Sequence, residues 1–240
     1  MHKEDFVYIF DIDGTLTPAR EPINPEFEKF FSSWISTHET HLVTGSDIAK
    51  TKEQIPHYIL NMCEGVFCCM GNVYFKKDTC IYVNDFNLPS EAIHFLKNCV
   101  RNSGYPSEDM GDLHIEYRTG MVNFSVVGRN ITHEQRIKYY EWDRIHNERK
   151  KIANEFNNLF MISGIEANIG GQISIDIQKV GFDKSQILNH IDTSRHKTVF
   201  FGDKCKPGEI DYPIYNSCDI KYEVSDWIEC YDILKNKYSN

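Results

Sequence analysis

The first apolar run of the chain, Phe6 to Phe10, has the length of a strand and shows no alternation with polar residues. Such a run predicts a strand that is buried on both faces, as in a parallel sheet. Residues 25 to 38 carry aromatic side chains at helical spacing, and 41 to 44 is a second short strand-like segment. A helix over 47 to 55 and a strand over 65 to 69 complete a predicted βαβαβ opening.

The pattern changes to that of an antiparallel unit after this opening. Ser90 is the predicted N-cap of a helix whose apolar residues have helical spacing. A hairpin is predicted over 114 to 127 and a second over 165 to 178, each with glycine at its turn. Between the hairpins, residues 132 to 160 predict a long helix that starts with a capping box and breaks near Asp143.

The parallel pattern returns after Gly181. Asp183 is the predicted N-cap of a helix that runs to Ile191, and residues 198 to 201 predict another buried strand. The predicted fold class is therefore α/β, with a parallel-sheet core and an inserted α+β domain that has an antiparallel sheet. The core is discontinuous, over 1–83 and 183–240, and the insertion covers 84–182.

Charge and hydropathy exclude some classes of partner. The 35 acidic residues outnumber the 26 basic ones and leave a formal charge of −9, which opposes the phosphate attraction that dominates nucleic-acid binding. The first apolar run is far shorter than a membrane span and lacks the flanks of a signal peptide. We therefore expect a cytoplasmic protein with no nucleic-acid or membrane partner.

The strongest chemical signal is Asp11-Ile12-Asp13-Gly14-Thr15, directly after the first strand. Carboxylates two residues apart in a loop at a strand end can face one site, with Asp11 attacking phosphorus and Asp13 moving a proton. A solvated acidic turn is the simpler alternative. A calcium-binding loop is a third, but it needs a Glu at its twelfth position, where this chain has Pro22.

The same string, Asp11 to Thr17, resembles the first motif of the haloacid dehalogenase superfamily, whose core is Rossmann-like. Three further motifs follow in the expected order: Thr44-Gly45-Ser46, Lys184 and Gly202-Asp203. The resemblance implies that Ser46 binds the transferring phosphoryl group and that Lys184 is catalytic and neutralises negative charge. Phosphoryl transfer needs such a set, because the group in flight spreads negative charge over three oxygens. The resemblance also implies Mg²⁺, and its predicted ligands are Asp11, Asp13 and Asp203.

The insertion resembles a narrower family. The strings 116 to 129 and 170 to 176, together with Arg136, resemble the cap domain of eukaryotic phosphomannomutases. This resemblance implies interconversion of mannose 1-phosphate and mannose 6-phosphate on the route to GDP-mannose, through a hexose 1,6-bisphosphate that also serves as activator. It further implies a cap that sets substrate specificity and pairs two chains into a homodimer.

Residue chemistry in the insertion agrees with that resemblance without requiring it. Alternation over 172 to 178 predicts one packed and one wet sheet face, and the wet face can hold sugar hydroxyls. The guanidinium groups of the cap suit a phosphate, with surface ion pairs as the alternative explanation for these arginines. For the polar face of 172 to 178, the alternative is an ordinary solvated sheet face. The resemblance assigns substrate binding to Arg20, Ser46, Arg118, Arg129, Arg136, Ser174 and Asp176.

Two strings depart from the family pattern. Where the family reads Pro-Glu-Asn-Gly, this chain has Cys68-Cys69-Met70-Gly71. Where the family reads Gly-Gly-Asn-Asp, it has Gly208-Glu209-Ile210-Asp211, so the Asn is lost and Asp211 is kept.

Two other functions remain as alternatives. A sugar-phosphate phosphatase of the same superfamily would share the core motifs and release inorganic phosphate, but it would not need the cap arginines. A catalytically silent sugar-phosphate sensor would not need a nucleophile, Asp11, beside an acid, Asp13. A phosphomannomutase is the prediction that uses all of these residues.

Overall fold

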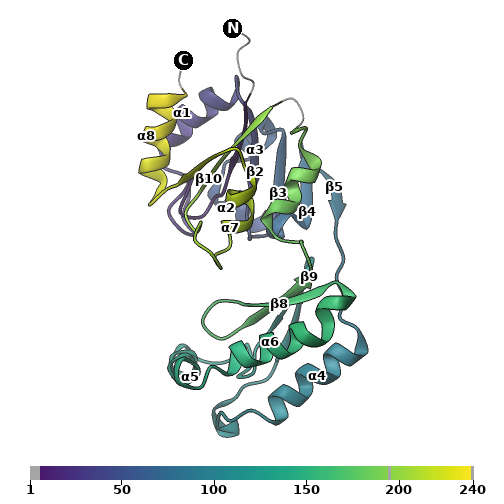
Figure 1. Cartoon of the computed structure of the whole chain (residues 1–240). Coiled ribbons are helices and arrows are strands. Elements are labelled where there is room, and N and C mark those ends of the chain that lie inside the picture. The colour runs from purple at the N-terminus through teal and green to yellow at the C-terminus, as the bar shows by residue number, and fades with distance from the viewer. Residues whose placement is uncertain (1–5, 194–195, 239–240) are drawn as a thin grey trace. The chain divides into compact units, whose positions relative to one another are not determined.

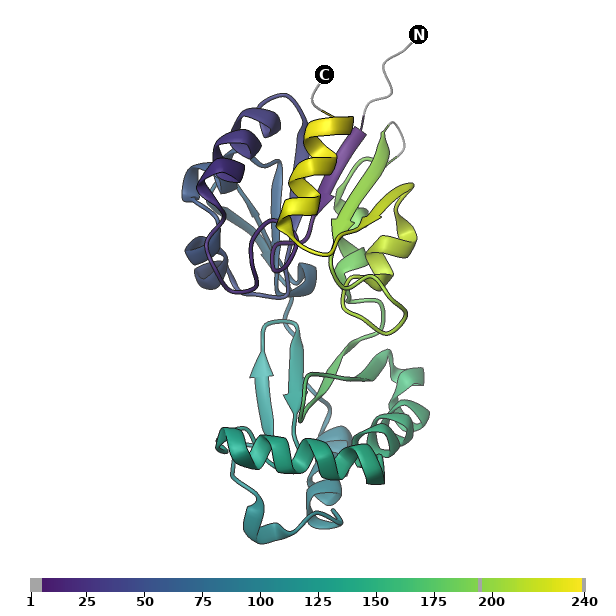
Figure 2. The same cartoon turned by 90° about the vertical axis from the view of Figure 1, so that its left-hand side faces the viewer.

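The computed structural model describes residues 6–193 and 196–238. The chain divides into two compact units, Met1–Val83 with Gly181–Asn240 and, between them in sequence, Asn84–Val180. We call the first the core unit and the second the inserted unit. The chain passes from the core unit into the inserted unit after Val83 and returns to the core unit after Val180 (Figure 2). Residues 1–5, 194–195 and 239–240 of the predicted core lie outside the described residues.

The core unit is built on a seven-stranded sheet with the order β11-β10-β1-β2-β3-β4-β5. The first five strands in this order run parallel to one another, and β4 and β5 are antiparallel additions at one edge. The predicted parallel sheet is therefore confirmed, with an antiparallel edge that the sequence patterns did not indicate. The strands are β1 Phe6–Phe10, β2 Glu39–Val43, β3 Gly65–Cys68, β4 Val73–Lys76, β5 Thr79–Val83, β10 Lys197–Gly202 and β11 Ile220–Glu223.

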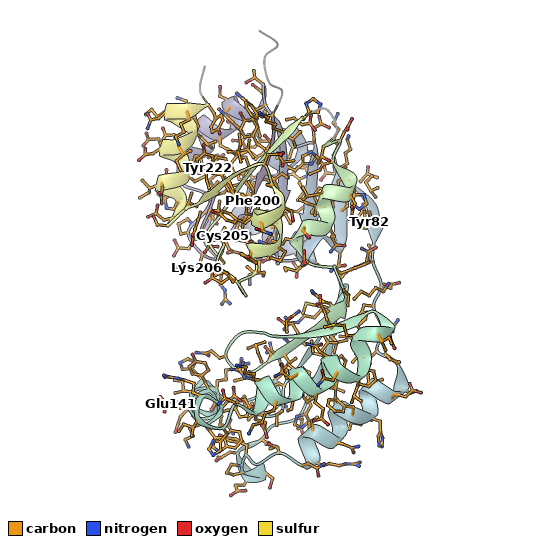
Figure 3. The ribbon with its side chains drawn as sticks, viewed as in Figure 1. Tyr82, Glu141, Phe200, Cys205, Lys206 and Tyr222 are labelled. Carbon is orange, nitrogen blue, oxygen red and sulfur yellow. The ribbon has the colours of Figure 1, made fainter. Side chains whose placement is uncertain are left out.

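Helices cover both faces of this sheet. On one face, α1 (Pro25–Ile35), α2 (Ile48–Gln54), α3 (His57–Met62) and α8 (Trp227–Lys237) share a single apolar cluster with the strands. Figure 1 shows α1 and α8 side by side, and the ring centroids of Phe27 and Tyr231 are 5.2 Å apart. On the other face, the 3₁₀ helix η4 (Lys184–His190) and α7 (Tyr212–Ser217) pack against side chains such as Phe200 (Figure 3).

Local chemistry explains where α1 begins. The Asn24 side chain accepts hydrogen bonds from the backbone N–H groups of Glu26 and Phe27, and Pro25 occupies the first helical position. The aromatic side chains at helical spacing then lie on the buried face, with Phe27 and Phe31 inaccessible to solvent. The sequence prediction of this helix is confirmed, although it ends three residues earlier than predicted, at Ile35.

The inserted unit contains a four-stranded antiparallel sheet with the order β6-β7-β9-β8. Both predicted hairpins are present in it. Its helices share one apolar cluster with the sheet, and α4 and α6 lie beside each other (Figure 1). The elements are α4 Ser90–Arg101, β6 Ile115–Arg118, β7 Met121–Phe124, α5 His133–His146, α6 Glu148–Phe160, β8 Ile165–Ile169 and β9 Ile175–Lys179, with short 3₁₀ turns η1 Cys69–Gly71 in the core unit and η2 Ser107–Asp109 and η3 Met161–Ser163 here.

Three boundary predictions need correction. Ser90 is the first residue of α4 rather than its cap, because Pro89 takes the cap position. The capping box of Thr132 and Gln135 is confirmed, but the helix breaks at Asn147, which has a left-handed backbone, and not at Asp143. Asp183 does cap a helix, which is a seven-residue 3₁₀ helix rather than an α-helix.

Within the described residues, no helix combines the length and the apolar character that a membrane crossing requires.

Candidate active site

The candidate active site of the core unit lies where adjacent parallel strands end. Asp11 follows β1, Thr44 follows β2 and Asp203 follows β10, and β1 lies between the other two strands. The carboxyl ends of parallel strands meet at one edge of a sheet, where α/β proteins bind ligands. The topology therefore explains how three motifs far apart in sequence converge.

Lys184 joins this edge from the first position of η4. Its Nζ donates to Asp11 Oδ1 at 2.5 Å and to Asp211 Oδ1 at 2.5 Å. Only 1% of the Lys184 side chain is exposed, so the ammonium is shielded from water and paired with these two carboxylates. Asp183 fixes the start of η4 by accepting the backbone N–H of Ser185 at 2.8 Å.

Three carboxylates form the acidic cluster of the site: Asp11, Asp203 and Asp211. One oxygen from each lies within 4.8 Å of the others. The absence of a side chain at Gly14 permits this packing, because a Cβ there would lie 2.4 Å from Asp203 Oδ2. Asp211 is completely buried, and its other oxygen accepts the backbone N–H of Lys204 at 3.2 Å.

The donor set of this acidic cluster fits Mg²⁺. Lys184 pairs with Asp11 and Asp211, and Lys204 Nζ lies 3.5 Å from Asp203 Oδ2, so three carboxylates face two ammonium groups and net negative charge remains. Asp203 Oδ1 is buried and has no hydrogen-bond partner among the described residues. Hard oxygen ligands with uncompensated charge are what a divalent cation such as Mg²⁺ prefers.

Burial and neighbouring charges shift the pKa values of Asp11, Asp203 and Lys184. Burial raises the pKa of Asp11, and the neighbouring Asp211 carboxylate raises it further, against the opposing effect of Lys184. Burial also raises the pKa of Asp203. Burial alone would lower the pKa of Lys184, but the two carboxylates that it contacts raise it above its ordinary value. Lys184 is therefore a permanent cation at neutral pH.

Asp13 has a different environment from the acidic cluster. Its Oδ1 accepts the backbone N–H of Arg20 at 2.8 Å and the side-chain amide of Gln54 at 2.9 Å. Gln54 Nε2 also donates to Thr17 Oγ1 at 3.1 Å, and Gln54 is buried. The structure thus brings Asp11 and Asp203 together but does not place the Asp13 carboxylate with them. The third carboxylate is Asp211, which the predicted metal set omits.

The loop after β2 is held by backbone contacts. Ser46 is half-buried, and its carbonyl accepts the backbone N–H of Cys69 at 2.9 Å, while Thr44 accepts that of Met70 at 2.9 Å. Cys69 and Met70 both have left-handed backbones, which suits this tight reversal. The departures from the family pattern meet beside Gly45: a Cβ there would lie 3.4 Å from Ile210 Cδ1 and 3.6 Å from Met70 Sδ.

Two of the predicted arginines of the inserted unit meet at one carboxylate, and the third lies beside them. Glu116 Oε2 accepts from Arg118 Nε at 2.9 Å and lies 3.4 Å from Arg129 Nε. Arg136 Nη2 donates to the backbone carbonyl of Arg129 at 3.0 Å. Burial and the charge of Arg118 lower the pKa of Arg129. Three guanidiniums with two carboxylates, Glu116 and the neighbouring Asp176, leave an excess of positive charge that suits an anion.

Asp176 lies next to these arginines. Burial raises its pKa, and the charges of Arg118 and Arg129 oppose that rise. Its Oδ1 accepts from Asn123 Nδ2 at 2.5 Å. The prediction that the polar face of 172 to 178 is wet is wrong for Ser174 and Gln178, which are 4% and 8% exposed. Gly170 lies against Ser174 Oγ, and Gln178 Nε2 donates to Glu166 of the neighbouring strand β8 at 3.4 Å.

Arg20 is placed differently from the other predicted substrate ligands. It belongs to the core unit, where it is exposed and has a left-handed backbone with a φ of 64°. Its backbone N–H binds Asp13. The core unit thus brings Arg20 next to the first motif, and the arginine cluster forms within the inserted unit.

Comparison with known sequences finds phosphomannomutases, both as a family model and as individual proteins. A family model described as eukaryotic phosphomannomutase matches residues 27–238, a range that begins after the Asp11 to Thr17 string. Phosphomannomutase 1 of Dictyostelium discoideum is 33% identical over 217 residues, which cover 88% of this chain and 86% of that protein. The phosphomannomutase of Encephalitozoon cuniculi is 34% identical over 224 residues, covering 90% and 87%. That of Drosophila melanogaster is 33% identical over 227 residues, covering 90% and 88%.

Comparison with solved structures shows a shared fold. An N-terminally truncated IMP-nucleotidase of Plasmodium falciparum has a TM-score of 0.60 and 16% identity, covering 99% of this chain and 71% of that one. The trehalose-6-phosphate phosphatase of Aspergillus fumigatus has a TM-score of 0.56 and 12% identity, covering 97% and 90%. At these identities the likeness concerns the fold alone.

Proposed function

Because the chain belongs to the eukaryotic phosphomannomutase family, we propose that it is an isomerase that interconverts mannose 1-phosphate and mannose 6-phosphate. The phosphoryl group passes through an aspartyl phosphate on Asp11 and a hexose 1,6-bisphosphate, which also activates the enzyme, and the product supplies GDP-mannose synthesis. The observation that carries this proposal is the buried contact of Lys184 with Asp11 beside Asp203 and Asp211.

In the proposed reaction, Asp11 Oδ attacks phosphorus while Lys184 stays protonated and stabilises the charge on the transferring oxygens. Asp11, Asp203 and Asp211 would hold Mg²⁺, which supplies neutralisation of the charge that builds up on the phosphoryl group. Ser46 and the backbone of its loop bind the same group. Loss of transfer on chelation, with recovery on adding Mg²⁺, is the expected result.

Asp13 is the proposed general acid and base. Its Oδ1 is engaged by Gln54 and the Arg20 backbone, so the proton is moved by Oδ2. It protonates the sugar oxygen that leaves in one direction and deprotonates the sugar oxygen that attacks the aspartyl phosphate in the other.

The inserted unit is the proposed cap domain that sets substrate specificity and pairs two chains in a cytoplasmic homodimer. Its arginines bind the phosphate that is not reacting, and Arg20 is a proposed substrate-binding residue of the core unit. Ser174 and Asp176 bind sugar hydroxyls. Two chemically different phosphate sites are what a mutase requires, since the bisphosphate must return in the reversed orientation.

Asp13→Asn should slow both half-reactions by roughly 10²-fold or more, because the amide keeps the shape of the side chain but cannot move the proton. Rapid-quench single-turnover kinetics should show slower formation and slower decay of the phosphoenzyme. Unchanged rates would remove Asp13 from the mechanism.

Arg129→Ala and Arg136→Ala should each weaken binding of mannose 1-phosphate by about 1.5 to 3 kcal/mol, because each removes a charged contact to phosphate. Titration calorimetry measures this directly, and the Mg²⁺ requirement should not change. Arg144→Ala, an exposed arginine on α5, is the matched control. If both variants bind as tightly as that control, these arginines only form surface ion pairs.

The test of the proposed function is the identity of the product. With mannose 1-phosphate, Mg²⁺ and catalytic glucose 1,6-bisphosphate, phosphorus NMR should show mannose 6-phosphate as the main product. The rival is a sugar-phosphate phosphatase of the same fold, which would release inorganic phosphate. Stoichiometric phosphate release without mannose 6-phosphate at any bisphosphate concentration would favour that rival.

A further inference from the structure

One buried side chain, Arg149 of α6, binds the loop between β8 and β9. Its Nη1 donates to the carbonyl of Gly171 at 2.7 Å and lies 3.3 Å from that of Ser174 and 3.4 Å from that of Gly170. A single guanidinium therefore contacts three backbone carbonyls of the loop: those of Gly170 and Ser174 at its two ends and that of Gly171 between them.

Arg149 is itself fixed by Asp143 of α5. The Arg149 Nε donates to Asp143 Oδ2 at 2.8 Å, and the Arg149 backbone N–H donates to Oδ1 at 2.9 Å. Their side chains are 6% and 8% exposed. Asn147 gives α6 no side-chain cap, so Asp143 satisfies one of the N–H groups that begin this helix. The break at Asn147 is what lets the chain fold back to make this contact.

The held loop lies against two proposed substrate ligands. A Cβ at Gly170 would lie 2.7 Å from Asp176 Oδ2 and 2.8 Å from Ser174 Oγ. The Gly170 backbone N–H also donates to the Ser174 carbonyl at 2.9 Å. Asn123 holds the other Asp176 oxygen. A shift of the loop would therefore move Gly170 into these groups or away from them.

We propose that Arg149 is a positioning residue, which fixes the 170–174 loop so that Ser174 and Asp176 are aligned for sugar hydroxyls. This inference rests on the proposed function. Burying an ion pair is costly, and well-packed apolar residues often stabilise a fold equally well. Here the guanidinium also donates to the carbonyls of the 170–174 loop, which an apolar residue in its place would leave without that donor. The guanidinium spreads its N–H donors over a planar fork, so Nε binds the Asp143 carboxylate while Nη1 reaches the loop carbonyls, a span that the single nitrogen of a lysine does not offer.

The test compares Arg149→Lys with Tyr139→Phe. Lysine keeps the charge opposite Asp143 but cannot span to the loop carbonyls. Tyr139→Phe is the control, because it removes a hydrogen bond to Glu148 at the same α5–α6 junction and leaves the donors of Arg149 to Asp143 and the loop in place. Circular dichroism and the thermal midpoint are recorded for both variants.

We expect Arg149→Lys to raise the KM for mannose 1-phosphate about tenfold or more, with kcat within about threefold of wild type. Phosphorylation of Asp11 by acetyl phosphate, which has no sugar hydroxyls, should be unchanged. Tyr139→Phe should leave KM unchanged. A folded Arg149→Lys variant with wild-type KM would overturn the inference, as would a loss of acetyl phosphate reactivity equal to the loss of sugar binding.

Asp143→Asn is the second variant, since it leaves the Arg149 carbonyl contacts in place but weakens their anchor. It should raise KM in the same direction by a smaller factor, and it decides the matter if Arg149→Lys does not fold. Wild-type KM in Asp143→Asn would then overturn the inference. Wild-type protein that makes no mannose 6-phosphate would instead contradict the proposed function, so the two failures are distinguishable.

Discussion

Replacing Asp11 by asparagine is expected to reduce phosphoryl transfer by a factor on the order of 10⁴ or more, which is typical for loss of a nucleophile. The amide has nearly the same shape as the carboxylate and can still contact Lys184. It cannot attack phosphorus at a useful rate. The fold should therefore survive, with an unchanged circular dichroism spectrum.

The measurement is a single-turnover reaction with mannose 1-phosphate and glucose 1,6-bisphosphate, followed by rapid quench. Asp232→Asn, on the exposed surface of α8, makes the same chemical change away from the site and should react like wild type. Turnover of the Asp11→Asn variant at the wild-type rate would show that another group carries the phosphoryl intermediate.

The second large effect is expected for Lys184→Met. Methionine fills a similar volume but leaves Asp11 and Asp211 facing each other without their shared cation. Breaking a buried ion pair in this way costs about 3 to 5 kcal/mol of stability. Loss of a charge that stabilises the transferring oxygens should also slow transfer about 10²- to 10³-fold.

Urea unfolding followed by circular dichroism gives the change in stability, and single-turnover kinetics at low urea gives the change in rate. Lys206→Met is the matched control, because Lys206 follows β10 and its side chain is 72% exposed (Figure 3). That control should change stability by less than about 0.5 kcal/mol. Equal effects of the two substitutions would contradict the role of Lys184.

The sequence predicts the parallel sheet well because its strands are buried on both faces. The segments Phe6 to Phe10 and Thr198 to Phe201 are apolar runs in which polar residues do not alternate, as expected for strands of a parallel sheet. The polar motifs follow directly at their ends. The contact between Lys184 and Asp11 spans 173 residues, so no periodicity can indicate it. It was predicted only through the resemblance of the motifs to a known superfamily.

Other features depend on tertiary contacts that local patterns do not carry. The antiparallel strands β4 and β5 are rich in β-branched and aromatic residues, yet no strand is predicted there from the sequence. Asp211 follows a turn and carries no periodic signal, yet it is completely buried against Lys184. Gln54 was missed because a polar residue at a helix end is ordinarily solvated. Here, Thr51 and Gln54 are the buried residues of α2, and Gln54 meets Asp13.

The burial of Ser174 shows the same limitation in the inserted unit. Alternation predicts which residues of β9 and the preceding segment share a face, and Ile173, Ile175 and Ile177 are indeed buried. It does not predict that Ser174 is buried as well. The 170–174 loop is held by Arg149, whose partner Asp143 is brought near by the left-handed turn at Asn147.

The central claim, that Asp11 carries the phosphoryl group, is tested most directly by trapping the phosphoenzyme. Enzyme mixed with Mg²⁺ and glucose 1,6-bisphosphate is quenched and treated with borohydride, which reduces an aspartyl phosphate to homoserine. Peptide mass spectrometry should then find homoserine at position 11 alone, and mannose 1-phosphate added before the quench should lower its yield while mannose 6-phosphate forms. Isomerisation that proceeds with no modification at position 11, or with modification at another carboxylate, would contradict the claim.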